Sequence, residues 1–174
     1  MRVWTIQRPD VLRALRDKAS WRATDSQLDA DLRRPYAWMA AQMRKRIATP
    51  ASFRSVPIWC WVQWRGQSEP RPDLRHRGHL PRGVRGVRLE LEIDADRLLC
   101  SDFDLWHFVL NDWPLPRPGD TRTPRTEPVP NRRAREASWL RIFDLAPTSS
   151  IRIQGVFAEL RRTDVIATQS FIAR

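Results

Sequence analysis

The segment Pro57–Trp64 constrains the fold most strongly, because both faces of the strand that it predicts are largely apolar. One set of alternate residues is Ile58, Cys60 and Val62, and the other is Trp59, Trp61 and Gln63. A strand that carries apolar side chains on both faces belongs inside a sheet rather than at its edge. We therefore expect this segment to be a central strand.

Further strand patterns surround this segment. Residues 2–7 alternate, with Val3, Thr5 and Gln7 on one face and Trp4 and Ile6 on the other. Residues 87–93 alternate cleanly, and residues 97–100 continue the sheet. Residues 151–160 and 165–172 form two more strand-like runs joined by residues 161–164, which predicts a terminal hairpin.

Helical spacing of apolar residues predicts four helices. The first covers residues 10–18 after Pro9, and the second covers residues 31–47 with Pro35 in its first turn. A third begins at Ser101 as N-cap, with Asp104 three residues later. Its apolar face comprises Phe103, Trp106, Leu110 and Trp113. The fourth covers residues 132–143, with Ala134, Ala137, Leu140 and Ile142 as its apolar residues. The order of elements predicts a mixed α+β domain, a single mixed sheet with flanking helices.

Two stretches have no period. Residues 68–86 are rich in Pro, Arg and Gly and are expected to form a loop. Residues 114–130 contain six prolines, a density that excludes a helix or a central strand. We expect one domain over residues 1–174 with residues 114–130 as an irregular excursion or lid within it.

The chain is strongly basic, with a formal net charge of +11, and all but two of its 31 basic residues are arginines. Such a charge favours polyanions, so nucleic acid is a candidate partner, although codon usage in the host also produces arginine-rich chains. The sequence predicts no membrane span and no secretory signal, which favours a cytoplasmic protein. Cys60 and Cys100 are expected to be small core residues.

Several blocks match a family pattern. They are Trp4–Gln7, Tyr36–Met39 with Gln42, Met43 and Arg46, Pro57–Trp61, Pro72–Arg75, Ser101–Asn111, Ser138–Asp144, and Gln154 with Phe171–Arg174. On these blocks the chain resembles a bacterial family, domain of unknown function 3841. That resemblance covers nearly the whole chain and implies no activity.

The order of elements is also similar, at the level of fold, to the ADP-ribosyltransferases, above all to those that modify DNA. This resemblance implies NAD⁺ as substrate, with its nicotinamide on aromatic rings, its diphosphate on an arginine, and a carboxylate beside the reacting ribose. The residues that it implies for NAD⁺ binding are Trp4, Gln7, Trp59, Trp61, Arg75 and Gln154. It implies Glu159 as the catalytic carboxylate. For each of these residues an ordinary structural role, in the core or in an ion pair such as Asp73–Arg75, stays open.

Asp104 and His107 form a second catalytic candidate, because residues three apart share one helix face. A carboxylate beside a histidine fixes its tautomer for general-base work. Alternatively, Asp102 and Asp104 cap the helix and His107 belongs to the core. No metal site is expected, since neither the aspartates nor His76 and His79 have further ligands at a recognisable spacing.

The sequence therefore leaves three functions open. The leading one is an NAD⁺-dependent ADP-ribosyltransferase-like enzyme that modifies nucleic acid or protein in a toxin or phage-defence setting. The second is a non-catalytic nucleic-acid-binding module that uses the arginines and exposed tryptophans. The third is an antitoxin-like interaction module whose segment 114–130 docks on a partner.

Overall fold

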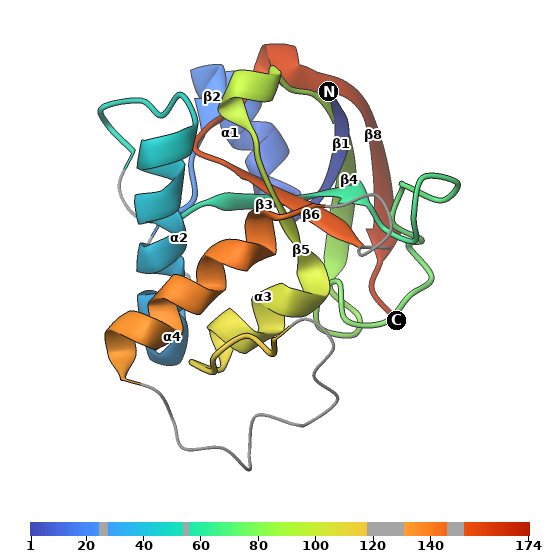
Figure 1. Cartoon of the computed structure of the whole chain (residues 1–174). Helices are drawn as coiled ribbons and strands as arrows, with labels where there is room; N and C mark the ends of the chain where they lie inside the picture. The colour runs from blue at the N-terminus through green and yellow to red at the C-terminus, as the bar shows by residue number, and fades with distance from the viewer. Residues whose placement is uncertain (25–27, 54–55, 118–130, 146–151) are drawn as a thin grey trace.

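A six-stranded sheet forms the centre of the protein (Figure 1). The computed structural model describes residues 1–24, 28–53, 56–117, 131–145 and 152–174. In spatial order the strands are β5 (Leu99–Asp102), β6 (Ile153–Phe157), β3 (Ile58–Gln63), β1 (Arg2–Gln7), β4 (Arg85–Glu92) and β8 (Val165–Ile172). Each neighbouring pair is antiparallel, so the α+β class is confirmed but the expected mixed sheet is an antiparallel one.

Four α-helices and a small second sheet complete the described part of the fold. The helices are α1 (Asp10–Lys18), α2 (Arg33–Arg46), α3 (Phe103–Leu110) and α4 (Arg132–Trp139). Short 3₁₀ turns are η2 (Ala30–Leu32), η3 (Ala95–Arg97), η5 (Leu140–Phe143) and η6 (Arg162–Asp164). The small sheet pairs β2 (Ser20–Trp21) with β7 (Leu160–Arg161). None of the helices in the described ranges is long and apolar enough to cross a membrane.

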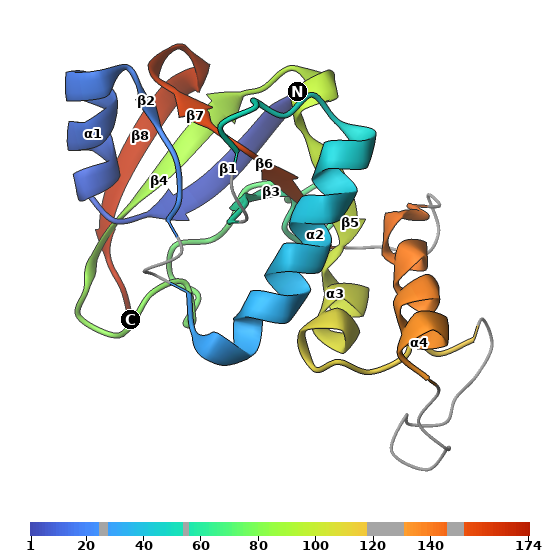
Figure 2. The same cartoon turned by 90° about the vertical axis from the view of Figure 1, so that its left-hand side faces the viewer.

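The large sheet separates two hydrophobic cores. On one face, α1 and the small sheet pack on strands β1, β3 and β4, through Leu15, Leu160 and Leu89 among others. On the other face, α2, α3 and η5 pack on β5 and β6, with Met39 and Val156 in that core. Figure 2 shows α1 on one side of the sheet and α2, α3 and α4 on the other.

Strand β3 has the central place that its sequence predicts, between β6 and β1. Its alternation divides its side chains between the two cores, with Ile58 and Cys60 in the first and Trp59 against the second. Each face of β3 is thus covered, which is why both sets of alternate residues are apolar.

The predicted terminal hairpin is wrong. Strand β6 pairs with β3 and β5, whereas β8 pairs with β4 at the opposite edge of the sheet. Val156 and Phe157 of β6 are both fully buried, in different cores, so β6 needs covered neighbours on both faces. Strand β8 is mostly exposed, as suits an edge. The connecting turn η6 is fixed by Asp164, whose carboxylate accepts from Arg97 Nη1 at 2.8 Å.

The N-cap of α3 also differs from the prediction. Ser101 lies in β5, and the cap is Asp102, whose Oδ1 accepts from the backbone N–H groups of Asp104 and Leu105 at 2.8 and 2.9 Å. Trp113 lies beyond the end of α3 and is 43% exposed, so it does not share the buried face with Trp106.

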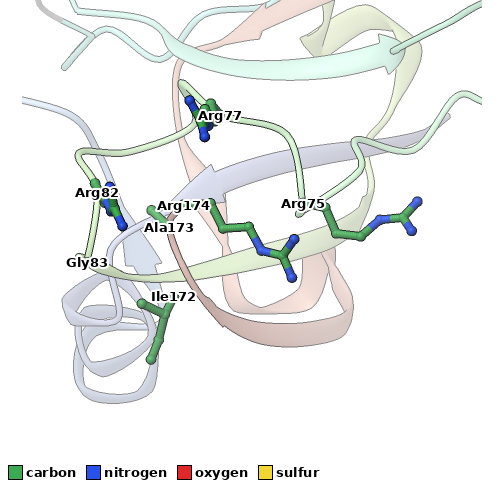
Figure 3. A pocket seen from close by; sticks show the side chains of 7 residues that line it. All are labelled: Arg75, Arg77, Arg82, Gly83, Ile172, Ala173 and Arg174. Carbon is green, nitrogen blue, oxygen red and sulfur yellow. The ribbon is translucent and has the colours of Figure 1, made fainter.

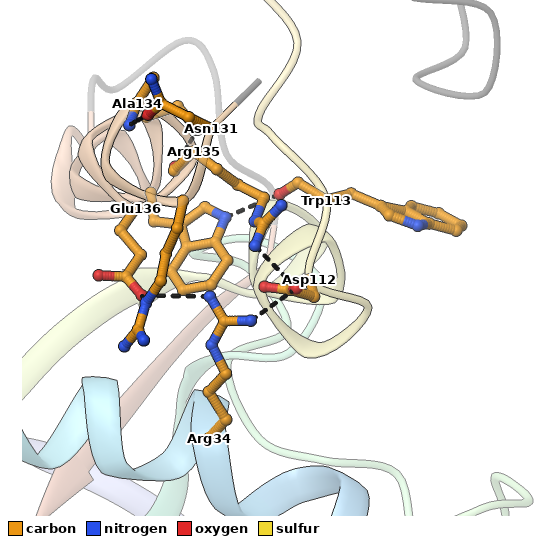
Figure 4. A network of polar contacts seen from close by, with 10 residues as sticks. Arg34, Asp112, Trp113, Asn131, Ala134, Arg135 and Glu136 are labelled. Carbon is orange, nitrogen blue, oxygen red and sulfur yellow. Dashed lines mark hydrogen bonds and ion pairs between the residues drawn. The ribbon is translucent and has the colours of Figure 1, made fainter. Parts of the chain in front are cut away.

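Ion pairs join α2, the end of α3 and α4 (Figure 4). Arg34 contacts Asp112 at 2.7 Å and Glu136 at 3.2 Å, and Arg135 contacts Asp112 at 3.0 Å. Beneath them, the indole of Trp139 donates to the carbonyl of Trp113 at 2.7 Å. In α4 and η5 the core residues are Trp139 and Ile142, while Leu140, another apolar residue of the predicted helix, is 42% exposed.

The first residues of the proline-rich segment pack against this region. Leu115 is buried in the second core, and its N–H donates to Ser138 Oγ at 3.0 Å. Residues 118–130 lie outside the described residues, so the predicted excursion over 114–130 is described only at residues 114–117.

Candidate ligand-binding site

A row of side chains crosses the sheet on the face opposite α1. The register pairs Ser101 with Gln154, Gln154 with Trp61, Trp61 with Trp4, and Trp4 with Glu90. Residues directly opposite each other on antiparallel strands project to the same face. Four strands that are distant in sequence therefore present a serine, an amide and two indoles side by side.

A pocket of about 420 Å³ opens above the middle of this row, and we call it the aromatic pocket. Its floor comes from Trp59, Trp61 and Gln154, and its sides come from α2, α3, the loop after β3 and the residue before β6. The lining residues are Ile6, Tyr36, Trp59, Cys60, Trp61, Trp64, His76, Arg77, Gly78, His79, Phe103, Trp106, His107, Leu110, Arg152 and Gln154.

The rings of this pocket form two clusters of contacting aromatic side chains. Trp61 lies 4.5 Å from Trp64 and 4.6 Å from Phe103, between ring centroids. Trp59 lies 4.8 Å from Trp106, and Tyr36 lies edge-on to Trp59 at 5.7 Å. Burial raises the pKa of the Tyr36 hydroxyl, so that group stays protonated at neutral pH. The pocket thus offers preformed flat apolar walls.

Buried donors without acceptors gather at the same place. Gln154 is only 5% exposed, and its Nε2 has no hydrogen-bond partner among the described residues. The same holds for Trp64 Nε1 and for Ser101 Oγ, the cross-strand neighbour of Gln154. A buried donor left unpaired costs about 1–3 kcal/mol, so each such group destabilises the free protein, and a ligand that supplies an acceptor would remove this cost.

Two arginines bring positive charge to the pocket. Arg152 lies over the ring of Phe103, with its guanidinium carbon 4.7 Å from the centroid, and it forms an ion pair with Asp104. Arg77 approaches from the loop between β3 and β4. Among the described residues that line the aromatic pocket there is no carboxylate, so its permanent charges are positive.

Hydrogen bonds fix the tautomers of two of the three histidines that line the pocket. His107 Nδ1 lies 2.9 Å from the carbonyl oxygen of Phe103, and a carbonyl only accepts, so Nδ1 carries the proton. The neutral ring therefore keeps Nε2 as a proton acceptor. His79 Nε2 contacts the carbonyl of Asp73 at 2.9 Å, which makes Nδ1 its acceptor.

A second cavity, the arginine cavity, lies next to the aromatic pocket and has a volume of about 820 Å³ (Figure 3). It is lined by Arg75, Arg77, Arg82, Gly83, Ile172, Ala173 and Arg174. Arg77 lines both cavities. The described residues that line the arginine cavity include no carboxylate side chain.

With this geometry in place, comparison with known proteins identifies the family. The model of one family, domain of unknown function DUF3841, matches residues 2–123, more than half of the chain. The chain belongs to this family. Searches of the curated proteins and of the solved structures found no significant match.

The matched part of this DUF3841 domain supplies most of the aromatic pocket. It contains β1, β3, the loop after β3, and α3. Gln154 and Arg152 lie beyond it, yet β6 inserts between β5 and β3 and brings both to the pocket. The site is therefore assembled from both parts of the chain.

Four of the predicted site residues line the aromatic pocket of the DUF3841 domain: Trp59, Trp61, Gln154 and His107. Asp104 reaches it only through its ion pair with Arg152. The tautomer of His107 is fixed by the carbonyl of Phe103 and not by Asp104, contrary to the expected carboxylate–histidine pair.

The other predicted residues lie elsewhere, so the candidate set does not form one site. Gln7 points to the opposite face from Trp4, because positions an odd number apart on a strand alternate, and its Nε2 donates to Thr5 Oγ1 at 2.8 Å. Trp4 lines a separate hollow with Arg88 and Glu90. Arg75 pairs with Asp73 at 2.8 Å and lines both this hollow and the arginine cavity.

Glu159 is the largest departure from the prediction. It lies after the end of β6 and lines a third cavity with Asp94, Asp96 and Arg97. Burial raises its pKa, but hydrogen bonds from Ser20, Arg22 and Arg161 outweigh that effect, so the net pKa is lowered. This carboxylate is a partner of arginines and does not line the aromatic pocket.

Sequence reasoning missed several pocket residues, namely Tyr36, Trp64, His76, Arg77, His79, Phe103 and Arg152. Phe103 and His107 are four apart on α3, a spacing that places them on one helix face and that could have been used. Nothing in the local pattern connects Arg77 or Arg152 with β3, because only the tertiary fold brings them there. Burial also raises the pKa of the Cys60 and Cys100 thiols, so neither is an activated nucleophile.

Proposed function

We propose that this protein binds a nucleotide, with the planar ring of the ligand in the aromatic pocket. The observation that carries the proposal is Gln154, a buried amide whose donor group has no acceptor and which lies at the floor of a pocket walled by aromatic rings. A heteroaromatic ring with a carbonyl oxygen supplies both the flat face and the missing acceptor.

The dimensions and charges support a ligand of this class. A volume of about 420 Å³ falls within the roughly 300–1,000 Å³ of small-molecule pockets. Arg77 and Arg152 provide positive charge at the pocket for the phosphate group that a nucleotide carries next to its ring and sugar.

NAD⁺ is the nucleotide that we propose first, as the substrate of an ADP-ribosyltransferase-like enzyme. Its nicotinamide carboxamide oxygen would accept from Gln154, and its diphosphate would lie toward Arg77. In the transfer step the bond between nicotinamide and ribose breaks, the acceptor nucleophile bonds to that ribose carbon, and the nucleophile's proton passes to His107 Nε2. Glu159 has no part in this proposal, because it lines another cavity.

Titration of the intrinsic tryptophan fluorescence with NAD⁺, nicotinamide mononucleotide, nicotinamide and AMP tests the binding step. We expect saturable changes with the nucleotides and about fivefold weaker binding after Gln154→Leu, since one hydrogen bond is worth about 1 kcal/mol. Unchanged affinity of the Gln154→Leu protein for all four compounds would remove the proposed role of the amide.

Release of nicotinamide from labelled NAD⁺ tests the enzymatic step separately, with DNA, RNA and protein acceptors. We expect His107→Gln to abolish release but to keep NAD⁺ binding, because the variant retains a polar side chain without a basic nitrogen. Binding without any release in the wild-type protein would leave a nucleotide-binding domain and exclude the transferase.

A further inference from the structure

Of the residues that line the arginine cavity, the proposed function uses only Arg77 and gives the other arginines no role. Four arginines line the cavity, and Asp73 pairs with one of them, Arg75. Among the described residues, no carboxylate forms an ion pair with the side chains of Arg77, Arg82 or Arg174. Like charges gathered without counterions are unfavourable unless an anion joins them.

The loop that carries these arginines is fixed to the end of β8. Gly83 N–H donates to Ala173 O at 2.9 Å, and Ala173 N–H donates to Val84 O at 3.0 Å. Gly83 has a φ of +83°, which a residue with a side chain rarely adopts. The neighbouring Gly86 lies directly against the ring of Phe171. These backbone contacts hold Arg82, which precedes Gly83, close to Arg174, which follows Ala173.

Arg77 connects the two cavities, because it lines both of them. A ligand with its ring against Trp61 and its phosphate at Arg77 would direct its next unit over Arg82 and Arg174. A nucleoside monophosphate carries one phosphate for three side chains, and a di- or triphosphate holds its phosphates in one short run, whereas a chain of nucleotides presents a phosphate at every step.

We propose that the arginine cavity binds the backbone of a single-stranded nucleic acid whose end base occupies the aromatic pocket. This inference rests on the proposed binding of a nucleotide ring in the aromatic pocket and names the ligand class; the end base and NAD⁺ would compete for that pocket. Single strands are favoured over duplexes, because a base enters an aromatic pocket only when it is unstacked. An acidic peptide has charge but no ring with a carbonyl for Gln154, so it fits the arginine cavity alone.

Fluorescence anisotropy with a labelled eight-nucleotide single strand, between about 50 and 200 mM NaCl, tests the inference on the whole chain. Each phosphate contact contributes about 0.7 to the slope of log affinity against log salt. We expect the double variant Arg77→Ala/Arg82→Ala to lower that slope by about 1.4 and to weaken binding. The matched control is Arg13→Ala/Arg16→Ala, two exposed arginines of α1 that line neither cavity, which should leave the slope unchanged.

The possible outcomes separate the two proposals. If mononucleotides bind and the oligonucleotide binds no tighter, the inference fails and the proposed function stands. If both pairs of substitutions lower the slope equally, the chain binds through its overall charge and the cavity has no special role. Equal affinity for a duplex of the same length, or for a poly-glutamate peptide, also overturns the inference. Tight oligonucleotide binding that Gln154→Leu leaves unchanged would show that no base contacts the amide and would overturn the inference, whereas the mononucleotide titration tests the proposed function separately.

Discussion

Trp61 and Gln154 face each other across the β3–β6 pair and project into the same pocket. An indole and a buried amide are thus held at the spacing of neighbouring strands, with no loop between them. Sites built on paired strands hold their geometry better than sites on loops. This pair is the rigid centre of the candidate site, and the arginines and histidines approach it from the surrounding loops and from α3.

Replacement of Gln154 by leucine should separate stability from binding. The amide is buried and its Nε2 has no acceptor among the described residues, so an apolar side chain of similar size removes a desolvated donor. We expect Gln154→Leu to raise the free energy of unfolding in urea by about 1 kcal/mol while it weakens nucleotide binding. Gln169→Leu is the contrast, because Gln169 Oε1 accepts from Arg88 and its loss should destabilise the fold.

The N-cap of α3 can be tested with two adjacent residues. Asp102→Ala removes the acceptor of two backbone N–H groups and should lower the free energy of unfolding by about 0.5–2 kcal/mol. Ser101→Ala should be neutral or slightly stabilising, since its Oγ is buried without a partner among the described residues. Thermal unfolding of both variants checks this, and a larger loss at Ser101 than at Asp102 would contradict the assigned cap.

Gly86 should not tolerate a side chain. A Cβ there would lie 2.5 Å from Phe171 Cε1 and 2.7 Å from Leu80 Cδ1. We expect Gly86→Ala to lower the free energy of unfolding by about 1–3 kcal/mol. Phe171→Leu makes room for the new methyl group, so Gly86→Ala should cost less in that background. Purely additive effects of the two substitutions in urea unfolding would show that the Phe171 ring is not the obstacle.

The ion pair of Arg97 with Asp164 should matter more than the exposed pairs. The two side chains are 12% and 6% exposed, and Asp164 also accepts from the N–H of Arg161 at 2.8 Å. Asp164→Ala leaves Arg97 uncompensated and should lower the free energy of unfolding by about 3–5 kcal/mol. Asp73→Ala breaks an exposed, solvent-screened pair and should leave the free energy of unfolding almost unchanged. Similar losses in the two variants would refute this ranking.

Glu136 should make stability depend on pH in the acid range. A hydrogen bond from Arg132, with a further one from Arg34, lowers the pKa of this carboxyl below its ordinary 4.5 (Figure 4). A lowered pKa in the folded state stabilises the protein above the unfolded value, and this contribution is lost as pH falls through the folded value. The melting temperature of Glu136→Gln should therefore lie below that of the wild type at pH 7. The difference should shrink as the pH falls below 4.5, and a constant difference would contradict the assignment.

Local patterns were enough for most elements. The alternation of residues 2–7 and 58–63 predicted β1 and β3 with the correct faces, and the apolar stripe after Pro9 predicted α1. These elements depend on periodicity, which a sequence displays directly. The prediction of Ser101 as N-cap was wrong. Serine and aspartate are both good N-cap residues, and only the end of β5 decides between Ser101 and Asp102.

Local patterns did not predict which strands that are distant in the sequence pair with each other. Residues 153–157 and 165–172 were each recognised as strands, but their expected pairing as a hairpin was wrong, because burial on both faces places β6 inside the sheet. The predicted residues of the candidate site were likewise separated by the strand pairing. The resemblance to ADP-ribosyltransferases implied Trp59, Trp61 and Glu159 together, but the two tryptophans of β3 line the aromatic pocket and Glu159 lines another cavity.

The sequence by itself determined which segments are strands and helices and which face of each is apolar, because side-chain periodicity is a local property. Only the tertiary structure decided that Gln154 faces Trp61, that Arg77 lies between two cavities, and that Glu159 pairs with Arg22. Those relationships join residues about 90 to 140 positions apart or depend on the path of a loop. They follow from the burial of two separate cores against one sheet, and no short-range pattern encodes that outcome.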